Sequence, residues 1–159
     1  MQVMTTQIAL VAARSRQRGI ICRAEEQFEP SYVFRRARDY CRRTYAEWYI
    51  LSTAHGVLAP RQVIGPGERP LRAISAEEQR QWAAGVGASL AARAARSAEP
   101  LSFVLFASQL CAELLQRAAP HCAFELPLGG LSLGERLRWY DERLATRPRL
   151  LGGAAVRPV

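Results

Sequence analysis

The sequence contains no lysine, and all 22 of its basic residues are arginine. A Schiff-base mechanism and a phosphate-binding lysine of the Gly-x-x-x-x-Gly-Lys type are therefore excluded. The chain also has no apolar run near the ~20 residues that a membrane-spanning helix requires. Its first residues lack a basic segment followed by an apolar core, so no signal peptide is predicted. We expect a cytoplasmic protein without a membrane partner.

The four cysteines form no Cys-x-x-Cys pair. Cys41 and Cys111 lie on apolar faces of predicted helices, which indicates buried, reduced thiols. His121 and Cys122 are the remaining candidates for a zinc site, but adjacent residues on a strand point to opposite sides. We therefore predict neither a metal nor a cofactor.

The formal net charge is +8, which favours an anionic partner. Arginine suits this role because its planar guanidinium binds phosphate or carboxylate through two parallel hydrogen bonds. A GC-rich genome, which selects arginine codons, is an alternative explanation for the missing lysine. It does not explain the excess of positive charge.

A chain of 159 residues corresponds to about one domain, which we place at residues 1–145, with a flexible tail at 146–159. Apolar runs predict four strands, and each is followed by a predicted helix. This alternation is typical of an α/β fold. We predict a three-layer sandwich, with a mostly parallel sheet of about four strands and helices on both faces. The expected strands are 6–13, 47–53, 101–107 and 122–128, and the expected helices are 30–44, 75–96, 108–118 and 133–145.

Parallel sheets bind ligands beyond the carboxyl ends of their strands. Four segments are expected there: Arg14–Arg18, Ser52–Gly56, Ala107–Gln109 and Leu128–Ser132. Helix N-termini that follow the third and fourth strands favour an anion at the same edge.

Two sets of arginines are candidate phosphate or nucleic-acid ligands. Arg14 and Arg16 follow the first strand, where they can clamp a phosphate. Arg35 and Arg42 belong to the arginine-rich face of helix 30–44, which can contact a nucleic-acid backbone. The alternative for both sets is a solvated charged surface.

The stretch from Glu47 to Leu58 changes from an apolar run to small polar residues and then to His55-Gly56. His55 is a candidate general acid or base, and Ser52 is a candidate nucleophile. The alternatives are a histidine that holds the loop and a serine that donates a hydrogen bond, since no Gly-x-Ser-x-Gly motif is present. The carboxylate that orients His55 would have to come from outside the block, from Glu25, Glu26 or Glu29. If the reaction is at a glycosidic bond, the carboxylate that stabilises the sugar would come from Glu25, Glu26 or Glu68.

The order of motifs resembles an uncharacterised family of small bacterial and phage α/β domains. The resemblance covers roughly residues 7–145, and it rests on Trp48–Leu58 (Trp-Tyr-Ile-Leu-Ser-x-x-His-Gly), Ala24–Phe34, Leu128–Leu131 and Trp139. The family is distantly similar to the core domain of archaeosine synthase. The resemblance therefore implies a link to base modification of tRNA or DNA.

This chain departs from the family pattern at three places. Ala12–Arg16 replaces Cys-Gly-x-x-Lys, Ala54 replaces a lysine, and Gly65–Glu68 replaces Pro-Tyr-Asp. The resemblance implies a nucleotide- or nucleic-acid-directed protein of base-modification type, which acts on an N-glycosidic bond if it is catalytic. The alternative is a degenerate, non-catalytic nucleic-acid-binding module or a subunit of a larger assembly.

Trp139 lies off the apolar stripe that we assign to the last helix, which comprises Leu133, Leu137, Tyr140 and Leu144. An off-stripe tryptophan beside arginines predicts a protein partner, a subunit interface or a stacked base. The alternative is packing against the C-terminal tail or the 54–74 loop.

Overall fold

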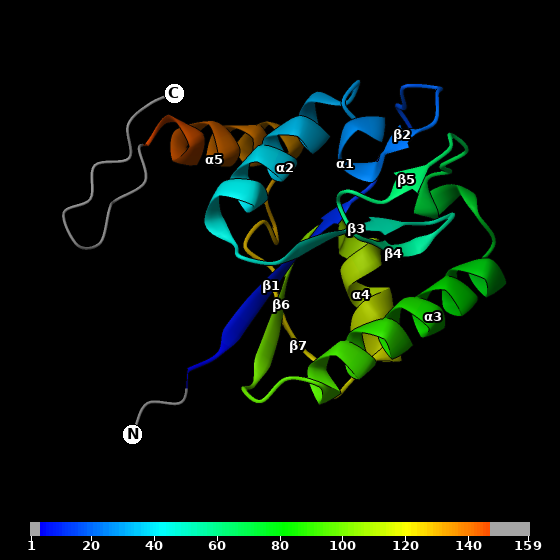
Figure 1. Ribbon diagram of the computed structural model, residues 1–159, viewed down its shortest axis with the longest axis vertical. Coiled ribbons are helices and arrows are strands. Elements are labelled where there is room, and N and C mark those ends of the chain that lie inside the picture. The colour runs from blue at the N-terminus through cyan, green and yellow to red at the C-terminus, as the bar shows by residue number, and fades with distance from the viewer. Residues whose placement is uncertain (1–3, 147–159) are drawn as a thin grey trace.

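The computed structural model describes residues 4–146 and is shown in Figure 1. Its main sheet has five strands in the order β4-β3-β1-β6-β7. They are β1 (Thr6–Ala12), β3 (Trp48–Ser52), β4 (Gly56–Leu58), β6 (Leu101–Phe106) and β7 (Ala123–Glu125). Strands β1, β3, β6 and β7 run parallel, and β4 pairs antiparallel with β3. The prediction of a mixed, mostly parallel α/β sheet is therefore confirmed.

Two details of the sheet differ from the prediction. Strand β4 lies within residues 54–74, which the sequence predicts to be a loop. Its three residues are too few to give a strand pattern of their own. Strand β7 is shorter than the expected 122–128, since the chain turns beyond Glu125, where Pro127 has no N–H to donate to a ladder.

The helices are α1 (Ala24–Gln27), α2 (Tyr32–Thr44), α3 (Ala76–Ala95), α4 (Gln109–Ala118) and α5 (Leu133–Ala145). The last three begin within one residue of the expected starts, and a serine caps each of them. Ser75 with Glu78 and Ser132 with Glu135 form complete capping boxes, and Ser108 accepts a hydrogen bond from Cys111 N–H. Helix α1, the 3-10 turn η1 (Leu71–Ala73), and the small antiparallel ladder of β2 (Cys22–Arg23) with β5 (Val63–Ile64) were not predicted.

The buried side chains form two clusters, and the alternation of β1 divides its residues between them. Ala9 and Val11 belong to the cluster that includes Phe34 of α2 and Tyr140 of α5. Ile8 and Leu10 belong to the other cluster, with residues of α3 and α4. Because successive strand residues point to opposite sides, the central strand contributes to both clusters. In Figure 1, α2 and α5 lie together, away from α3 and α4.

No helix within residues 4–146 has the length and apolar character needed to cross a membrane. The predicted tail at 146–159, apart from Thr146, lies outside the described residues.

The structure corrects the prediction for α5. Leu133, which we placed on the buried stripe, is 59% exposed, whereas Trp139 packs against the core with its ring 4.9 Å from Tyr40 and 6.1 Å from Phe106. The buried face of α5 therefore keeps Tyr140 and Leu144 of the expected stripe but extends to Trp139, because the aromatic cluster between α2 and β6 takes up the large indole. The Arg143 guanidinium lies 3.8 Å from the Trp139 ring centroid. This packing accounts for Trp139 within the chain, and a partner at this face stays a prediction.

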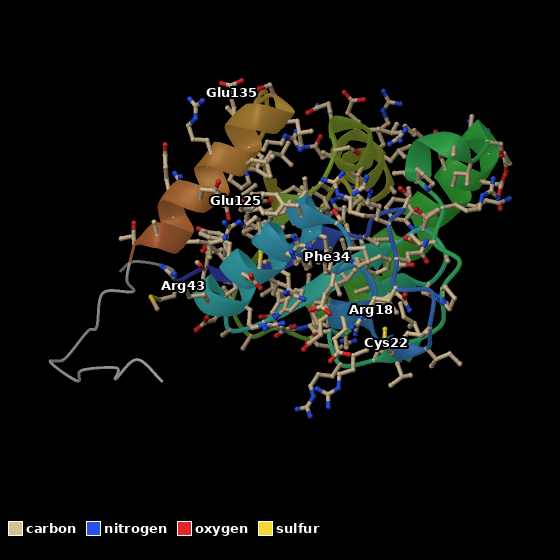
Figure 2. All side chains as sticks on the ribbon, turned by 90° about the horizontal axis from the view of Figure 1, so that it is seen from above. Arg18, Cys22, Phe34, Arg43, Glu125 and Glu135 are labelled. Atoms are coloured by element: carbon tan, nitrogen blue, oxygen red, sulfur yellow. The ribbon has the colours of Figure 1, made fainter. Side chains whose placement is uncertain are left out.

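The arginine face of α2 is also not uniformly solvated. Arg38 is a further arginine of this helix, but it is only 8% exposed and donates to the Glu29 carboxylate at 2.9 Å and to Glu25 C=O at 2.9 Å. Arg43, which Figure 2 shows at the end of α2, donates to the carbonyl groups of Arg143 and Leu144. Arginines of α2 thus stabilise the fold by holding α1 and α5.

Candidate anion-binding site at the carboxyl edge of the sheet

The carboxyl ends of β1, β3 and β6 lie at one edge of the sheet, because these strands are parallel neighbours. A pocket of about 330 Å³ opens there. Its lining residues include 12–15 at the end of β1 and just beyond it, Thr53 after β3, residues 69–72 before α3, Trp82 of α3 and Ser108 at the start of α4. The sequence prediction that separate segments meet at this edge is therefore confirmed for the first three strands.

Leu128–Ser132, the fourth segment, lies beside the same edge. Arg136 of α5 links it to the end of β6, since its guanidinium donates to Leu131 C=O and to Ala107 C=O, both at 3.1 Å. Arg136 and Leu128 line a small crevice together with Arg14. The loop after β7 is thereby fixed next to the loop after β1.

Three arginines, Arg14, Arg69 and Arg72, line the 330 Å³ pocket, and no aspartate or glutamate does. Within residues 4–146, none of the three forms an ion pair or donates a side-chain hydrogen bond. Arginines brought together without a carboxylate repel one another, and a bound anion relieves that repulsion. The pocket therefore has the charge pattern of an anion site.

Arg14 experiences this repulsion directly. Arg14 is exposed, and partial burial of its guanidinium lowers its pKa, against an opposing effect of Tyr140, while the charges of Arg136 and Arg72 lower it further. Since arginine remains protonated at neutral pH, Arg14 keeps its positive charge beside other positive charges. A bound anion relieves that repulsion.

The start of α4 adds backbone donors to the same pocket. Ser108 is the N-cap of this helix, and its hydroxyl accepts a hydrogen bond from Cys111 N–H at 3.2 Å. The first N–H groups of a helix lack intrahelical partners and carry the positive end of the helix dipole. The anion expected at helix N-termini on this edge would face both these donors and the arginines.

The other predicted arginines lie elsewhere. Arg16 is exposed and does not line the pocket. Arg35 donates to Glu29 C=O, and Arg42 forms an ion pair with Glu25 at 3.6 Å. Of the four predicted phosphate ligands, the structure brings only Arg14 to the pocket.

Ser52 lies at the end of β3, where its side chain is fully buried beside the carboxylate of Glu68. Its hydroxyl donates to Glu68 Oε1 at 2.9 Å, and the same carboxylate accepts from the N–H groups of Thr53 at 2.8 Å and Ala54 at 3.0 Å. Ser52 Oγ in turn accepts from His55 N–H at 3.0 Å. The Ser52–Glu68 pair therefore holds the turn between β3 and β4.

The backbone of Glu68 is held by Gln17, which belongs to the loop after β1. The Gln17 amide oxygen accepts from the N–H groups of Gly67 and Glu68 at 2.8 and 2.9 Å, and its amide nitrogen donates to Glu68 C=O at 3.0 Å. This network joins the loops after β1 and β3 to the segment that carries Arg69 and Arg72. It positions the arginines of the pocket.

His55 is exposed on the β3–β4 turn, and it lines none of the hollows described above. Only its backbone bonds to Ser52. Gly56 follows with a φ of +75°, a conformation that glycine adopts without steric cost. The structure thus brings Ser52 to Glu68, and it does not bring the His55 imidazole to the pocket.

The predicted carboxylates also separate. Glu68 alone contacts Ser52, whereas Glu25, Glu26 and Glu29 form ion pairs with arginines of α2 and of the loop after β1. No group of three or more His, Cys, Asp or Glu side chains within residues 4–146 is arranged to hold a metal ion.

Sequence reasoning missed Arg69, Arg72, Trp82 and Gln17. The two arginines belong to a proline- and glycine-rich stretch that gives no periodic signal, and Trp82 reads as an ordinary core residue of α3. The one available signal was the family motif position at Gly65–Glu68, which marks the stretch as more than a linker.

A second hollow, of about 350 Å³, lies next to the first and shares Thr53, Arg69 and Trp82 with it. Its other lining residues include Glu78 and Gln81 of α3. The Trp82 indole N–H donates to Ser52 C=O at 2.8 Å, which fixes the ring between the two hollows.

These observations define a mostly parallel α/β domain with an arginine-lined pocket at the carboxyl edge of its sheet. The chain belongs to a family of unknown function, DUF6884, whose model matches residues 8–142. This finding agrees with the resemblance to an uncharacterised family. Comparisons with curated proteins and with solved structures give no match.

Proposed function

We propose that this domain binds a phosphate-bearing nucleotide unit in the 330 Å³ pocket, either as a free nucleotide or within a nucleic acid. The observation that carries the proposal is the convergence of Arg14, Arg69 and Arg72 on a pocket that no carboxylate lines. Arginine matches the geometry of a phosphate because its N–H groups reach two oxygens at once. The formal net charge of +8 favours an anionic ligand of this kind.

The architecture supports the same place for a ligand. We infer a three-layer arrangement, in which α2 and α5 cover one face of the sheet and α3 and α4 cover the other. In such folds, ligands bind beyond the carboxyl ends of the strands, and phosphates favour helix N-termini. The pocket meets both conditions, since it lies at that edge and Ser108 opens α4 into it.

Two versions of this function differ in whether a reaction follows binding. In one, the domain modifies a base or cleaves an N-glycosidic bond, as the resemblance implies. In the other, it is a non-catalytic binding module or a subunit of an assembly. The buried Ser52 hydroxyl and the Glu68 carboxylate are occupied with one another and with the turn, which favours the binding module. His55 is the one candidate catalytic side chain that is exposed.

Calorimetric titration with a nucleoside monophosphate, and with short single- and double-stranded DNA and RNA at two salt concentrations, tests binding and separates its sources. The double variant Arg14→Ala/Arg72→Ala is expected to bind at least about tenfold more weakly, since each lost charge-assisted hydrogen bond contributes roughly 1.5–3 kcal/mol. Arg117→Ala is the matched control, because Arg117 is exposed near the far end of α4. Equal affinities of the double variant and the control would refute the proposal.

The catalytic version is tested by base release from the same oligonucleotides. Release that is lost in His55→Ala, with binding retained, would establish the enzyme. Binding without release, weakened by the arginine substitutions but not by His55→Ala, would establish the module.

A further inference from the structure

The hollow beside the arginine pocket differs from it in chemistry. The two share Thr53, Arg69 and Trp82, so one small ligand can occupy both. The arginine pocket is lined by three arginines and no acidic residue, whereas the second hollow is lined by one arginine, Arg69, and one acidic residue, Glu78. A phosphate is therefore attracted more strongly to the arginine pocket than to the second hollow. The two hollows thus offer one place for an anionic group and one for a neutral group.

Trp82 gives the second hollow an aromatic wall. Its side chain is half-buried, and its N–H donation to Ser52 C=O holds the ring in place without any ligand. A ring fixed in advance loses little freedom when a flat ligand stacks on it. Stacking of a base on an aromatic side chain contributes roughly 1–3 kcal/mol.

Polar groups surround this wall at the start of α3. Gln81 is exposed, and its amide nitrogen donates to Glu77 at 3.2 Å. Its amide oxygen accepts no hydrogen bond from another side chain or from the backbone within residues 4–146. Glu78 Oε1 accepts from Ser75 N–H in the capping box, at 3.3 Å, which leaves its second oxygen for another donor. Acceptors of this kind match the ring and exocyclic N–H groups of a nucleobase.

We propose that the second hollow binds the base of the nucleotide, stacked on Trp82 with its N–H groups toward Gln81 and Glu78. This inference rests on the proposed function, because the phosphate in the arginine pocket anchors the ligand. Volumes of about 330 and 350 Å³ are at the lower end of the range for small-molecule sites, which fits one nucleotide shared between the two hollows.

Calorimetric titration with three probes tests the inference: a nucleoside monophosphate, ribose 5-phosphate and inorganic phosphate. The monophosphate is expected to bind at least about fivefold more tightly than ribose 5-phosphate, from the stacking contribution alone. Gln81→Ala and Trp82→Leu are expected to reduce this ratio. Gln81→Ala should leave the affinity for ribose 5-phosphate unchanged, because Gln81 does not line the arginine pocket. Gln116→Ala is the control, since Gln116 is an exposed glutamine of α4.

Two failures are distinguishable. Equal binding of the monophosphate and ribose 5-phosphate, or a ratio that Gln81→Ala leaves at the wild-type value, would overturn the base site and leave the phosphate site standing. If none of the three probes binds, the proposed function fails, and the base site fails with it. Gln81→Ala keeps the test decisive even if Trp82→Leu does not fold, because Gln81 is on the surface.

Discussion

Replacing Glu68 with alanine is expected to destabilise the fold, although Glu68 lies in a loop. Its carboxylate accepts three hydrogen bonds, from the Ser52 hydroxyl and from the backbone N–H groups of Thr53 and Ala54, at 2.8–3.0 Å. No other acceptor is bonded to the buried Ser52 hydroxyl within residues 4–146. The variant leaves this donor unsatisfied.

The magnitude follows from those three bonds. A hydrogen bond to a charged acceptor contributes roughly 1.5–3 kcal/mol, and Ala54 N–H can bond to water in the variant because Ala54 is exposed. Counting Ser52 and Thr53 alone, the free energy of unfolding should fall by about 3 kcal/mol. For a domain of this size, that corresponds to a Tm lower by roughly 6–12 °C.

Urea unfolding, monitored by circular dichroism, measures this change as a shift of the midpoint at constant m-value. Glu68→Gln should lose about half as much, because the remaining oxygen can take the place of Oε1, which serves both Ser52 and Ala54. Glu142→Ala, an exposed residue of α5, is the control and should stay within about 0.5 kcal/mol of the wild type. A Glu68→Ala variant as stable as this control would refute the structural role of the Ser52–Glu68 pair.

Three further outcomes are expected. Arg38→Met should lower the free energy of unfolding by roughly 2 kcal/mol, because it leaves the Glu29 carboxylate without its partner. The loss is smaller than for a fully buried ion pair, since Glu29 is about a third exposed. A loss below about 0.5 kcal/mol in urea unfolding would contradict this. Gly85→Ala should raise the free energy of unfolding by about 0.5–1 kcal/mol, since an added Cβ meets no atom within 4 Å. Gly87→Ala should raise it by less, because the added Cβ would lie 3.3 Å from the Cβ of Ala118 in α4. Equal gains for the two variants in urea unfolding would contradict a steric cost at Gly87. Burial raises the pKa of the Cys111 thiol to about 12, so at pH 8 it should react with a thiol reagent far more slowly than Cys22, and similar rates in the folded protein would be inconsistent with a buried thiol.

The order of the four parallel strands and of the helices α2 to α5 could be predicted from the sequence, and so could three helix starts. Strands and helices follow from hydrophobic periodicity, and a cap such as Ser75 with Glu78 depends only on residues three positions apart. These signals are local, and packing does not have to be known to read them. The convergence of several segments on the carboxyl edge followed as well, because parallel strands place their ends together.

Tertiary structure decided which side chains meet at that edge. Arg69 and Arg72 join Arg14 only because Gln17 and Ser52 hold the intervening loop against the sheet through Glu68. The sequence gives no local sign of these contacts, because a proline- and glycine-rich stretch has no period and its course depends on what it packs against. The burial of Arg38 and the packing of Trp139 against Tyr40 could not be predicted for a related reason. A helix pattern shows which residues share a face, but it does not show which neighbour covers that face.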